Sequence, residues 1–286
     1  GAVKDYTIAR ERIKVASVKG WQHLPGGGWD YFIDPVDKIG YIRLTNFTKT
    51  TDEEMDAAIA EMRKKGTRAM ILDLRYNPGG LLTAATAVCD KFLHSGIIVS
   101  TKSEREGDTQ SPPAISATES PDDVNFPLVV LINQYSASAS EIVSGALKDQ
   151  HRATIVGERS FGKGSVQMLY PLDGRSAFLK LTTSHYYLPS GRCIHRDENS
   201  TTWGVDPDFT ITMTPKQMGD AIEARQDLDV LRSSVVNQAQ QSVKPTTSPS
   251  VSATTSPTTK KDVFASDPQL DAALLVLHLK LAGAAI

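Results

Sequence analysis

A wholly apolar run that passes directly into an amphipathic segment constrains the fold of this chain more than any other feature. The run Leu128–Ile132 contains no polar residue, which is typical of a strand buried on both faces of a parallel sheet. After a short link, apolar side chains recur with the spacing of one helix face. They are Ala139, Ile142, Val143, Ala146 and Leu147. The pattern predicts a buried strand, a tight turn and a helix in succession.

Three serines, Ser136, Ser138 and Ser140, lie where this turn meets the helix. A hydroxyl at a helix start has unpaired backbone N–H groups and the positive end of the helix dipole nearby, which suits the nucleophile of an acyl transfer. The segment from Ser138 to Glu141 also fits a capping box, in which Ser138 only begins the helix. Taken alone, the local pattern favours capping, because serine is a common N-cap residue.

A second strand, turn and helix follow the same plan. Ala69–Arg75 predicts a buried strand, and the helix is expected from Leu81 to about Leu93. Between them, Gly79 and Gly80 can adopt positive φ and bring the backbone close to a ligand. Their N–H groups could point the same way and hold an oxyanion. An ordinary glycine turn explains the pattern equally well.

The segment from Gly157 to Gly164 nearly matches a phosphate-binding loop, but two features exclude nucleotide binding. Gly164 stands where Ser or Thr should bind magnesium, and the residues that follow alternate like a strand although such a loop must open a helix. Lys163 instead lies between glycines, close to Phe161. Burial in an apolar place would favour a neutral lysine, which can act as a general base. A solvated turn lysine is the commoner case.

Composition and ligand spacing exclude several other classes of function. The net charge is −2 and the basic residues are scattered, so neither nucleic acid nor an anionic membrane is an expected partner. His185 and His195 lack metal-ligand spacing, and no metal or cofactor is expected. Cys89 lies in an apolar helical pattern and Cys193 beside a turn, which leaves a disulfide between them open. No signal peptide and no membrane-length apolar span are apparent.

The 286 residues divide into four predicted parts. The parts are a terminal strand with its connection in 1–20, a core in 21–232, a Ser/Thr/Pro-rich linker in 233–265 and a helix in 266–286. The linker has few apolar residues to bury, so we expect no packed structure there. Pro268 suits the first position of the last helix, whose leucine stripe should dock on the core or on a partner.

Five segments together make the chain resemble the carboxyl-terminal processing (tail-specific) serine proteases. They are Val3–Ile13, Leu72–Leu81, Ser136–Ile142, Gly157–Gln167 and Tyr186–Arg192. The resemblance covers about residues 1–232 and the last helix. It implies a mixed α/β fold with a crotonase/Clp-like β-β-α protease core. It also implies a preceding PDZ domain, of which residues 1–20 would retain only the last strand.

The resemblance further implies a Ser–Lys dyad. The lysine of this family follows its serine by 25 residues, and Ser138 and Lys163 have that separation whereas Ser136 and Ser140 do not. Histidine plays no part in such a dyad. The resemblance therefore assigns the nucleophile to Ser138 and the general base to Lys163.

Supporting roles come from the same resemblance. Gln167 would orient the lysine, and Asp149 would support the site. The oxyanion hole would use the backbone N–H of Ala139 and the turn of Gly79 and Gly80. Expected partners are protein or peptide substrates recognised through their C-termini, with homo-oligomers formed through the terminal segments. The expected location is outside the bacterial cytoplasm, in the periplasm or cell envelope.

Two other classes of protein stay open at this stage. One is a non-catalytic ligand-binding member of the crotonase/Clp-like superfamily, which an intact Ser138, Lys163 and Gln167 disfavours. The other is a crotonase-like acyl-CoA enzyme, which would need an acidic pair over the substrate carbon and a site for CoA. Labelling with a serine-reactive fluorophosphonate tests the first alternative, and a CoA titration tests the second.

Overall fold

The structure is a computed structural model and describes residues 15–24, 26–103, 113–120, 124–172, 177–230 and 263–284. Within these residues the main sheet has seven strands. Five are parallel neighbours: β5 (Ile39–Leu44), β6 (Ala69–Asp73), β9 (Leu128–Ile132), β10 (Thr154–Gly157) and β13 (Phe209–Thr210). Two short strands, β1 (Val18–Lys19) and β4 (Phe32–Asp34), run antiparallel to β5.

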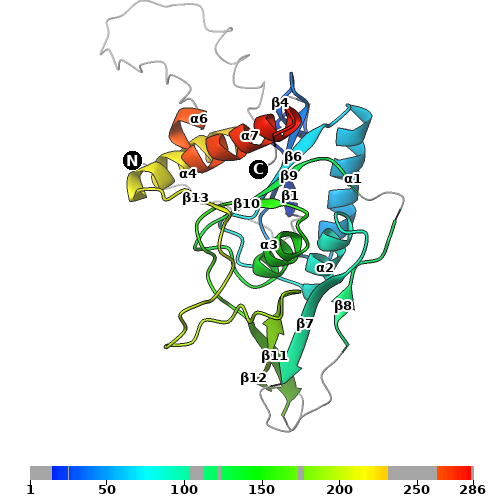
Figure 1. Ribbon diagram of the computed structural model, residues 1–286, viewed down its shortest axis with the longest axis vertical. Helices are drawn as coiled ribbons and strands as arrows, with labels where there is room; N and C mark the ends of the chain where they lie inside the picture. Colours follow the sequence, from blue (N-terminus) through cyan, green and yellow to red (C-terminus); the bar gives the residue numbers. More distant parts are fainter. Residues whose placement is uncertain are drawn as a thin grey trace, which may run out of the picture.

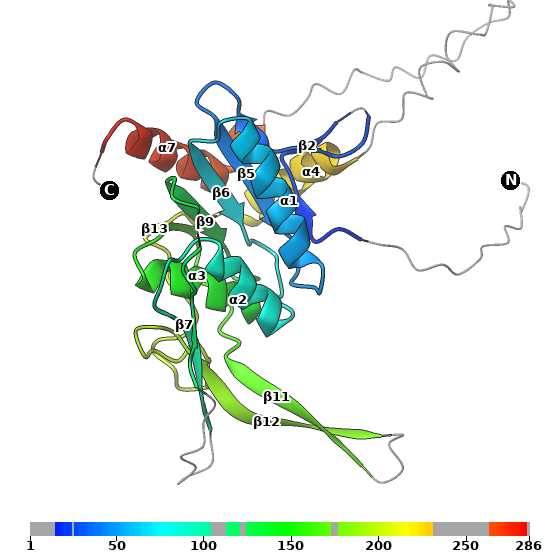
Figure 2. The same cartoon turned by 90° about the vertical axis from the view of Figure 1, so that its right-hand side faces the viewer.

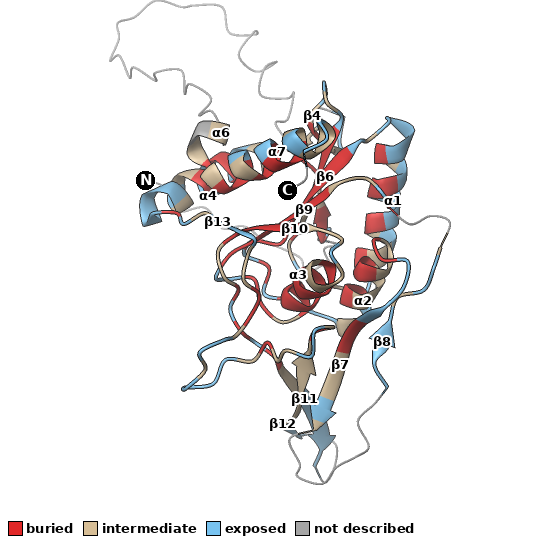
Figure 3. Ribbon diagram, viewed as in Figure 1, coloured by how far each residue is buried: buried red, intermediate tan, exposed pale blue. Residues whose placement is uncertain are grey.

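Helices cover both faces of this sheet, which therefore forms the middle of three layers (Figure 1). One face carries α1 (Thr51–Lys64), α2 (Leu82–Asp90) and α3 (Ala139–Asp149). The other face carries α7 (Pro268–Leu281), beside which lie α4 (Pro215–Asp229) and α6 (Val263–Ser266). Buried residues concentrate along the strands and the inner sides of the helices (Figure 3). Coverage on both faces explains why β6 and β9 are buried throughout.

A smaller sheet projects from the body and ends in a long hairpin (Figure 2). Its order is β11 (Ser165–Pro171), β12 (Phe178–Tyr187), β7 (Ile97–Ser103) and β8 (Ile115–Ser116). A further pair, β2 (Gln22–His23) and β3 (Trp29–Asp30), forms a separate ribbon. Far from the body, β11 and β12 expose large apolar side chains, including Leu169 and Phe178.

The helix α7 docks on the main sheet as its leucine stripe predicted. Leu270, Leu274 and Leu277 are buried against the strands, and Pro268 is at the helix start. The N-cap residue Asp267 accepts a hydrogen bond from the backbone N–H of Leu270 at 3.1 Å. The Asp267 carboxylate also pairs at 2.8 Å with Arg75, which follows β6. Residues 192 positions apart in the chain therefore form one buried ion pair.

The predicted mixed α/β class and the repeated strand–turn–helix units are confirmed. Residues 1–14 lie outside the described residues, so the expected terminal strand is seen only as β1. Most of the expected linker lies outside them as well, and the four-part division stays a prediction. Cys89 is buried, Cys193 is half-buried and both are free. None of the described helices combines the length and apolar character needed to cross a membrane.

Candidate active site

The turn between β9 and α3 holds Ser138 in a strained backbone conformation. Ser138 is the N-cap of α3 and has φ 54° and ψ −113°. A non-glycine residue with positive φ is uncommon, and such strain persists only where the surroundings hold it. A sharp strand-to-helix turn of this kind presents a serine hydroxyl at the edge of the sheet in α/β-hydrolases. The local backbone is therefore shaped for presentation of a side chain.

The structure separates the three serines of this turn by burial. Ser136 and Ser140 are fully buried. Ser136 Oγ donates to the carbonyl of Leu74, and Ser140 Oγ donates to the carbonyl of Asn77, both at 2.9 Å. Ser138 is the one of the three that is partly exposed. Two of the serines thus hold the turn against the glycine loop, and only Ser138 can meet a substrate.

A buried carboxylate joins the Ser138 turn to the Lys163 turn. The Glu141 side chain is fully buried, and its Oε2 accepts the backbone N–H groups of Ser138 and Lys163, each at 2.8 Å. Its Oε1 accepts the N–H of Gly162 and the hydroxyl of Ser160, each at 2.6 Å. Burial raises the pKa of Glu141 above its ordinary value, although these four hydrogen bonds oppose the shift. One oxygen thus holds both turns.

Lys163 itself is exposed, which agrees with the commoner case of a solvated turn lysine and excludes the alternative of burial in an apolar place. The neighbouring Phe161 is also exposed and does not cover the lysine. Because Glu141 Oε2 binds the amides of both Ser138 and Lys163, these two backbone nitrogens lie within two hydrogen-bond lengths of each other. No hydrogen bond joins Lys163 Nζ to Ser138 Oγ within the part of the chain that the structure describes. The two backbone turns are held together, and a contact between the lysine amine and the serine hydroxyl would require a different side-chain rotamer of Lys163.

The glycine turn after β6 packs directly on the serine turn. A Cβ atom added to Gly79 would lie 2.8 Å from Ser138 Cβ and 3.0 Å from the backbone nitrogen of Ala139. Gly79 also has φ 101°, which other residues rarely adopt. The turn is held by Asn77, which is fully buried and whose side-chain amide donates to the carbonyl of Leu44 at 2.9 Å. Only glycine permits this close approach.

The prediction that both glycine N–H groups face an oxyanion needs a correction at Gly79. Its N–H donates to Asn77 Oδ1 at 2.9 Å and is not available to a ligand. The N–H groups of Gly80 and Ala139 have no hydrogen-bond partner among the described residues. Gly79 therefore supplies the close approach, while Gly80 and Ala139 are the donors left for a developing negative charge.

The two expected supporting residues lie in different places. Gln167 is exposed on β11, next to a register shift, and it is not hydrogen-bonded to Lys163 in the described part of the chain. Asp149 is the last residue of α3 and accepts the N–H of Ser190 at 2.9 Å. The other end of an 11-residue helix is about 15 Å away at 1.5 Å per residue. The structure does not bring Asp149 to the site.

Sequence reasoning missed the cross-link made by Glu141. The capping box pointed to its bond with Ser138, but no signal in the sequence indicated the bonds to Ser160, Gly162 and Lys163. At this site the described residues include no group of three metal-ligating side chains. Among the described residues the one group that could hold an ion is Asp34, Asp37 and His278, where α7 meets the loop after β4.

The chain is similar in sequence to known proteins. The model of Peptidase family S41 matches residues 38–211. A Carboxy-terminal-processing protease of Bartonella bacilliformis is 42% identical over 211 residues, which are 72% of this chain and 43% of that protein. A Carboxyl-terminal-processing protease of Picosynechococcus sp. is 39% identical over 180 residues, or 63% of this chain and 40% of that protein.

Solved structures of proteases also resemble this chain. The photosystem II D1 C-terminal processing protease matches with a TM-score of 0.56 and 31% identity, over 71% of this chain and 50% of that one. Mature CPAF in complex with lactacystin matches with a TM-score of 0.51 and 17% identity, over 66% of this chain and 48% of that one, which is a likeness of fold alone. This chain spans less than half the length of the two curated relatives.

Proposed function

Because the chain belongs to peptidase family S41, we propose that it is a serine endopeptidase that cleaves proteins recognised near their C-termini. The observation that carries the proposal is the shared carboxylate oxygen of Glu141, which holds the amides of Ser138 and Lys163 side by side. The partial exposure of Ser138, against two fully buried serine neighbours, supports its choice as nucleophile.

The proposed reaction is an acyl transfer through a covalent intermediate. The side chain of Lys163 turns toward Ser138, and its unprotonated amine takes the proton from Oγ as this oxygen attacks the peptide carbonyl. The oxyanion accepts hydrogen bonds from the N–H groups of Gly80 and Ala139. Lys163 then gives its proton to the leaving amine. A water molecule, deprotonated in turn by Lys163, hydrolyses the ester and restores Ser138.

The remaining roles also belong to the proposal. Gln167 would orient Lys163 once the lysine side chain turns inward, since both lie at the base of the same hairpin. Asp149 would support the site only indirectly, by holding the turn at Ser190. Recognition of C-terminal residues, self-association through the terminal segments and export from the cytoplasm are further parts of this proposal.

Fluorophosphonate labelling tests the nucleophile. We expect one label per chain, located on Ser138 by peptide mass spectrometry, and no label on a folded Ser138→Ala variant. Absence of labelling in the wild-type protein would favour the non-catalytic alternative. A label on a different serine would assign the role of nucleophile to that serine. A titration with CoA addresses the crotonase-like alternative, for which saturable binding would be required.

A further inference from the structure

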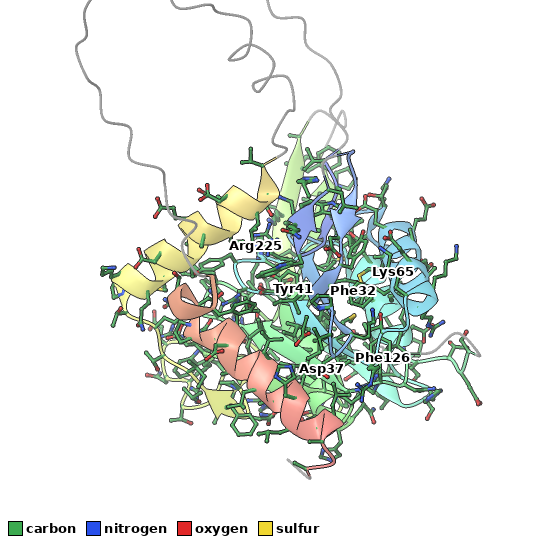
Figure 4. The ribbon with its side chains drawn as sticks, turned by 90° about the horizontal axis from the view of Figure 1, so that it is seen from above. Phe32, Asp37, Tyr41, Lys65, Phe126 and Arg225 are labelled. Atoms are coloured by element: carbon green, nitrogen blue, oxygen red, sulfur yellow. The ribbon has the colours of Figure 1, made fainter. Side chains whose placement is uncertain are left out.

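A cavity of about 400 Å³ lies on the α4 side of the main sheet, away from α1–α3. Side chains alternate between the two faces of a strand, and this alternation brings the polar strand residues of the cavity to the α4 side of the sheet. Arg43 and Asp73 lie on the same strand faces as the buried Tyr41 and Ile71, which pack on the α7 side. Figure 4 shows Arg225 of α4 pointing toward Tyr41 from above the sheet. The cavity is large enough for a small ligand.

Three cations in this cavity share a single carboxylate. Lys19 Nζ lies 3.0 Å from Asp229, Arg225 Nη2 lies 3.4 Å from it, and Arg43 also pairs with it. Burial alone would raise the pKa of Asp229, but the positive charges of Arg43 and its neighbours lower it below the ordinary value. Asp229 is therefore ionised at neutral pH, and its one negative charge leaves two positive charges uncompensated among these four groups.

The other arginine of the cavity does not add to this excess. Arg75 pairs with Asp73 and Asp267, each at 2.8 Å. Counted over all the charged groups of the lining, four cations face three carboxylates. A ligand with one negative charge would balance the cavity, whereas a dianion would overcompensate it.

Buried arginine nitrogens in the lining lack acceptors. Arg225 is only 8% exposed, and its Nε and Nη1 have no hydrogen-bond partner among the described residues. The same is true of Arg43 Nε. Arg225 Nη2 is satisfied by the carbonyls of Gly20 and Trp21 at 2.9 and 2.6 Å. Unpaired buried donors are costly, and proteins normally supply each one with an acceptor. These nitrogens are closed off from solvent, and the Arg225 guanidinium lies over the rings of Trp21 and Tyr41, so a ligand in the cavity would offset their charge without bonding to them.

The cavity also has an apolar side and adjoins the candidate active site. Ala221 and Ile222 of α4 form part of its wall. On the rim, Tyr76 has φ 59°, another strained conformation, and its ring stacks on that of Tyr135 with centroids 5.5 Å apart. Tyr76 precedes the glycine turn, and Tyr135 precedes the serine turn. A ligand that contacts Tyr76 would touch the segment that leads into the glycine turn and would lie one stacked ring away from the segment that leads into the serine turn.

We propose that this cavity binds a small monocarboxylate with an apolar body, such as the C-terminal residue of a peptide or a short organic acid. The carboxylate would approach Lys19 and the guanidinium group of Arg43, since the planar guanidinium fork matches a carboxylate. The apolar body would lie against Ile222 and Tyr76. This site is separate from the Ser138 turn and does not depend on the proposed peptidase activity.

Calorimetric titration of the full chain with four probes tests the chemistry. The probes are N-acetyl-leucine, its neutral amide, hexanoate and inorganic phosphate. We expect saturable binding of N-acetyl-leucine and no binding of the amide or of phosphate. Hexanoate that binds as well as N-acetyl-leucine would assign the site to organic acids, and weaker hexanoate binding would assign it to peptide C-termini. Equal binding of acid and amide, preferred binding of phosphate, or no binding of any probe overturns the proposal.

Two variants locate the binding. Lys19→Gln should weaken N-acetyl-leucine binding about tenfold to a hundredfold, the usual effect of losing one charged hydrogen bond. Ile222→Glu places a carboxylate on the cavity wall without removing a cation, and should abolish binding while the melting curve confirms a folded protein. The control Lys216→Gln removes an exposed lysine of α4 outside the cavity and should bind like the wild type. Unchanged binding in both Lys19→Gln and Ile222→Glu would exclude this cavity.

Discussion

Replacing Glu141 by glutamine tests whether its carboxylate holds the turns of Ser138 and Lys163 together. The carboxylate accepts four hydrogen bonds, two on each oxygen. Glutamine keeps one oxygen and places an NH2 group where the other stood, so two donors lose their acceptor and face another donor. At about 1–3 kcal/mol for each unsatisfied buried donor, the free energy of unfolding should fall by about 2–6 kcal/mol. Relief from burying a charge offsets part of this loss.

The assay combines urea unfolding with the rate of fluorophosphonate labelling. We expect Glu141→Gln to lower the urea midpoint and to slow labelling under conditions where the variant is still fully folded. The matched control is Glu53→Gln, which makes the same change at an exposed position of α1. If Glu141→Gln unfolded and reacted like Glu53→Gln, the cross-link would contribute nothing, and the argument that places Lys163 beside Ser138 would lose its support.

Three further predictions concern the base, the glycine turn and acid stability. Lys163→Arg should impair cleavage of an unfolded reporter protein as strongly as Lys163→Ala, because arginine does not release its proton near neutral pH; near-normal cleavage by the arginine variant would remove the lysine from the role of base. Gly79→Ala should abolish labelling and destabilise the fold, since its Cβ would lie 2.7–2.8 Å from backbone and side-chain atoms of the serine turn; Gly219→Ala in α4, where a Cβ meets nothing within 4 Å, should leave labelling intact and stabilise by up to about 1 kcal/mol. Burial would raise the pKa of Asp73, but the guanidinium and hydrogen bonds of Arg75 lower it below the ordinary value. The unfolded chain therefore binds this proton first as the pH falls, and the stability that Asp73 contributes, complete above a pH of about 4, is lost as the pH falls through its folded-state pKa. Urea unfolding of the wild type and of Asp73→Asn across this range should show a shallower pH dependence for the variant, and parallel curves would contradict the assignment.

The strands and helices around the site could be predicted because burial on both faces leaves a plain signature in the sequence. The run Leu128–Ile132 became β9 without change, and the helical stripe after Ser138 became α3. The choice of Ser138 over its two neighbours came from the 25-residue spacing to Lys163, and the structure adds the burial of Ser136 and Ser140 as an independent reason.

The errors concern properties that depend on contacts between distant segments. The choice between a solvated and a buried Lys163 stayed open, because the segments that pack around its turn are remote in the sequence. The hydrogen bond from Gly79 to Asn77 is local, but only the folded turn shows which N–H groups remain available. Asp149 was predicted from its spacing of 11 residues after Ser138. Because these residues form the helix α3, Asp149 lies at the end of the helix that is remote from the site. The Glu141 cross-link depends on loops that meet only in the folded protein.

The buried ion pair of Arg75 and Asp267 affects the order in which parts of the chain fold during synthesis. A ribosome completes β6, β9 and α3 long before it reaches α7, so Arg75 first has Asp73 as its only acidic partner among the described residues. The strand that leads into the glycine turn gains its second partner only when Asp267 has been synthesised and α7 has docked. Because pairing a buried charge incompletely is costly, the turn beside Ser138 should become fully ordered late in synthesis. A nascent chain would then carry Ser138 through the synthesis of the 129 residues up to Asp267 without a fully ordered glycine turn beside it.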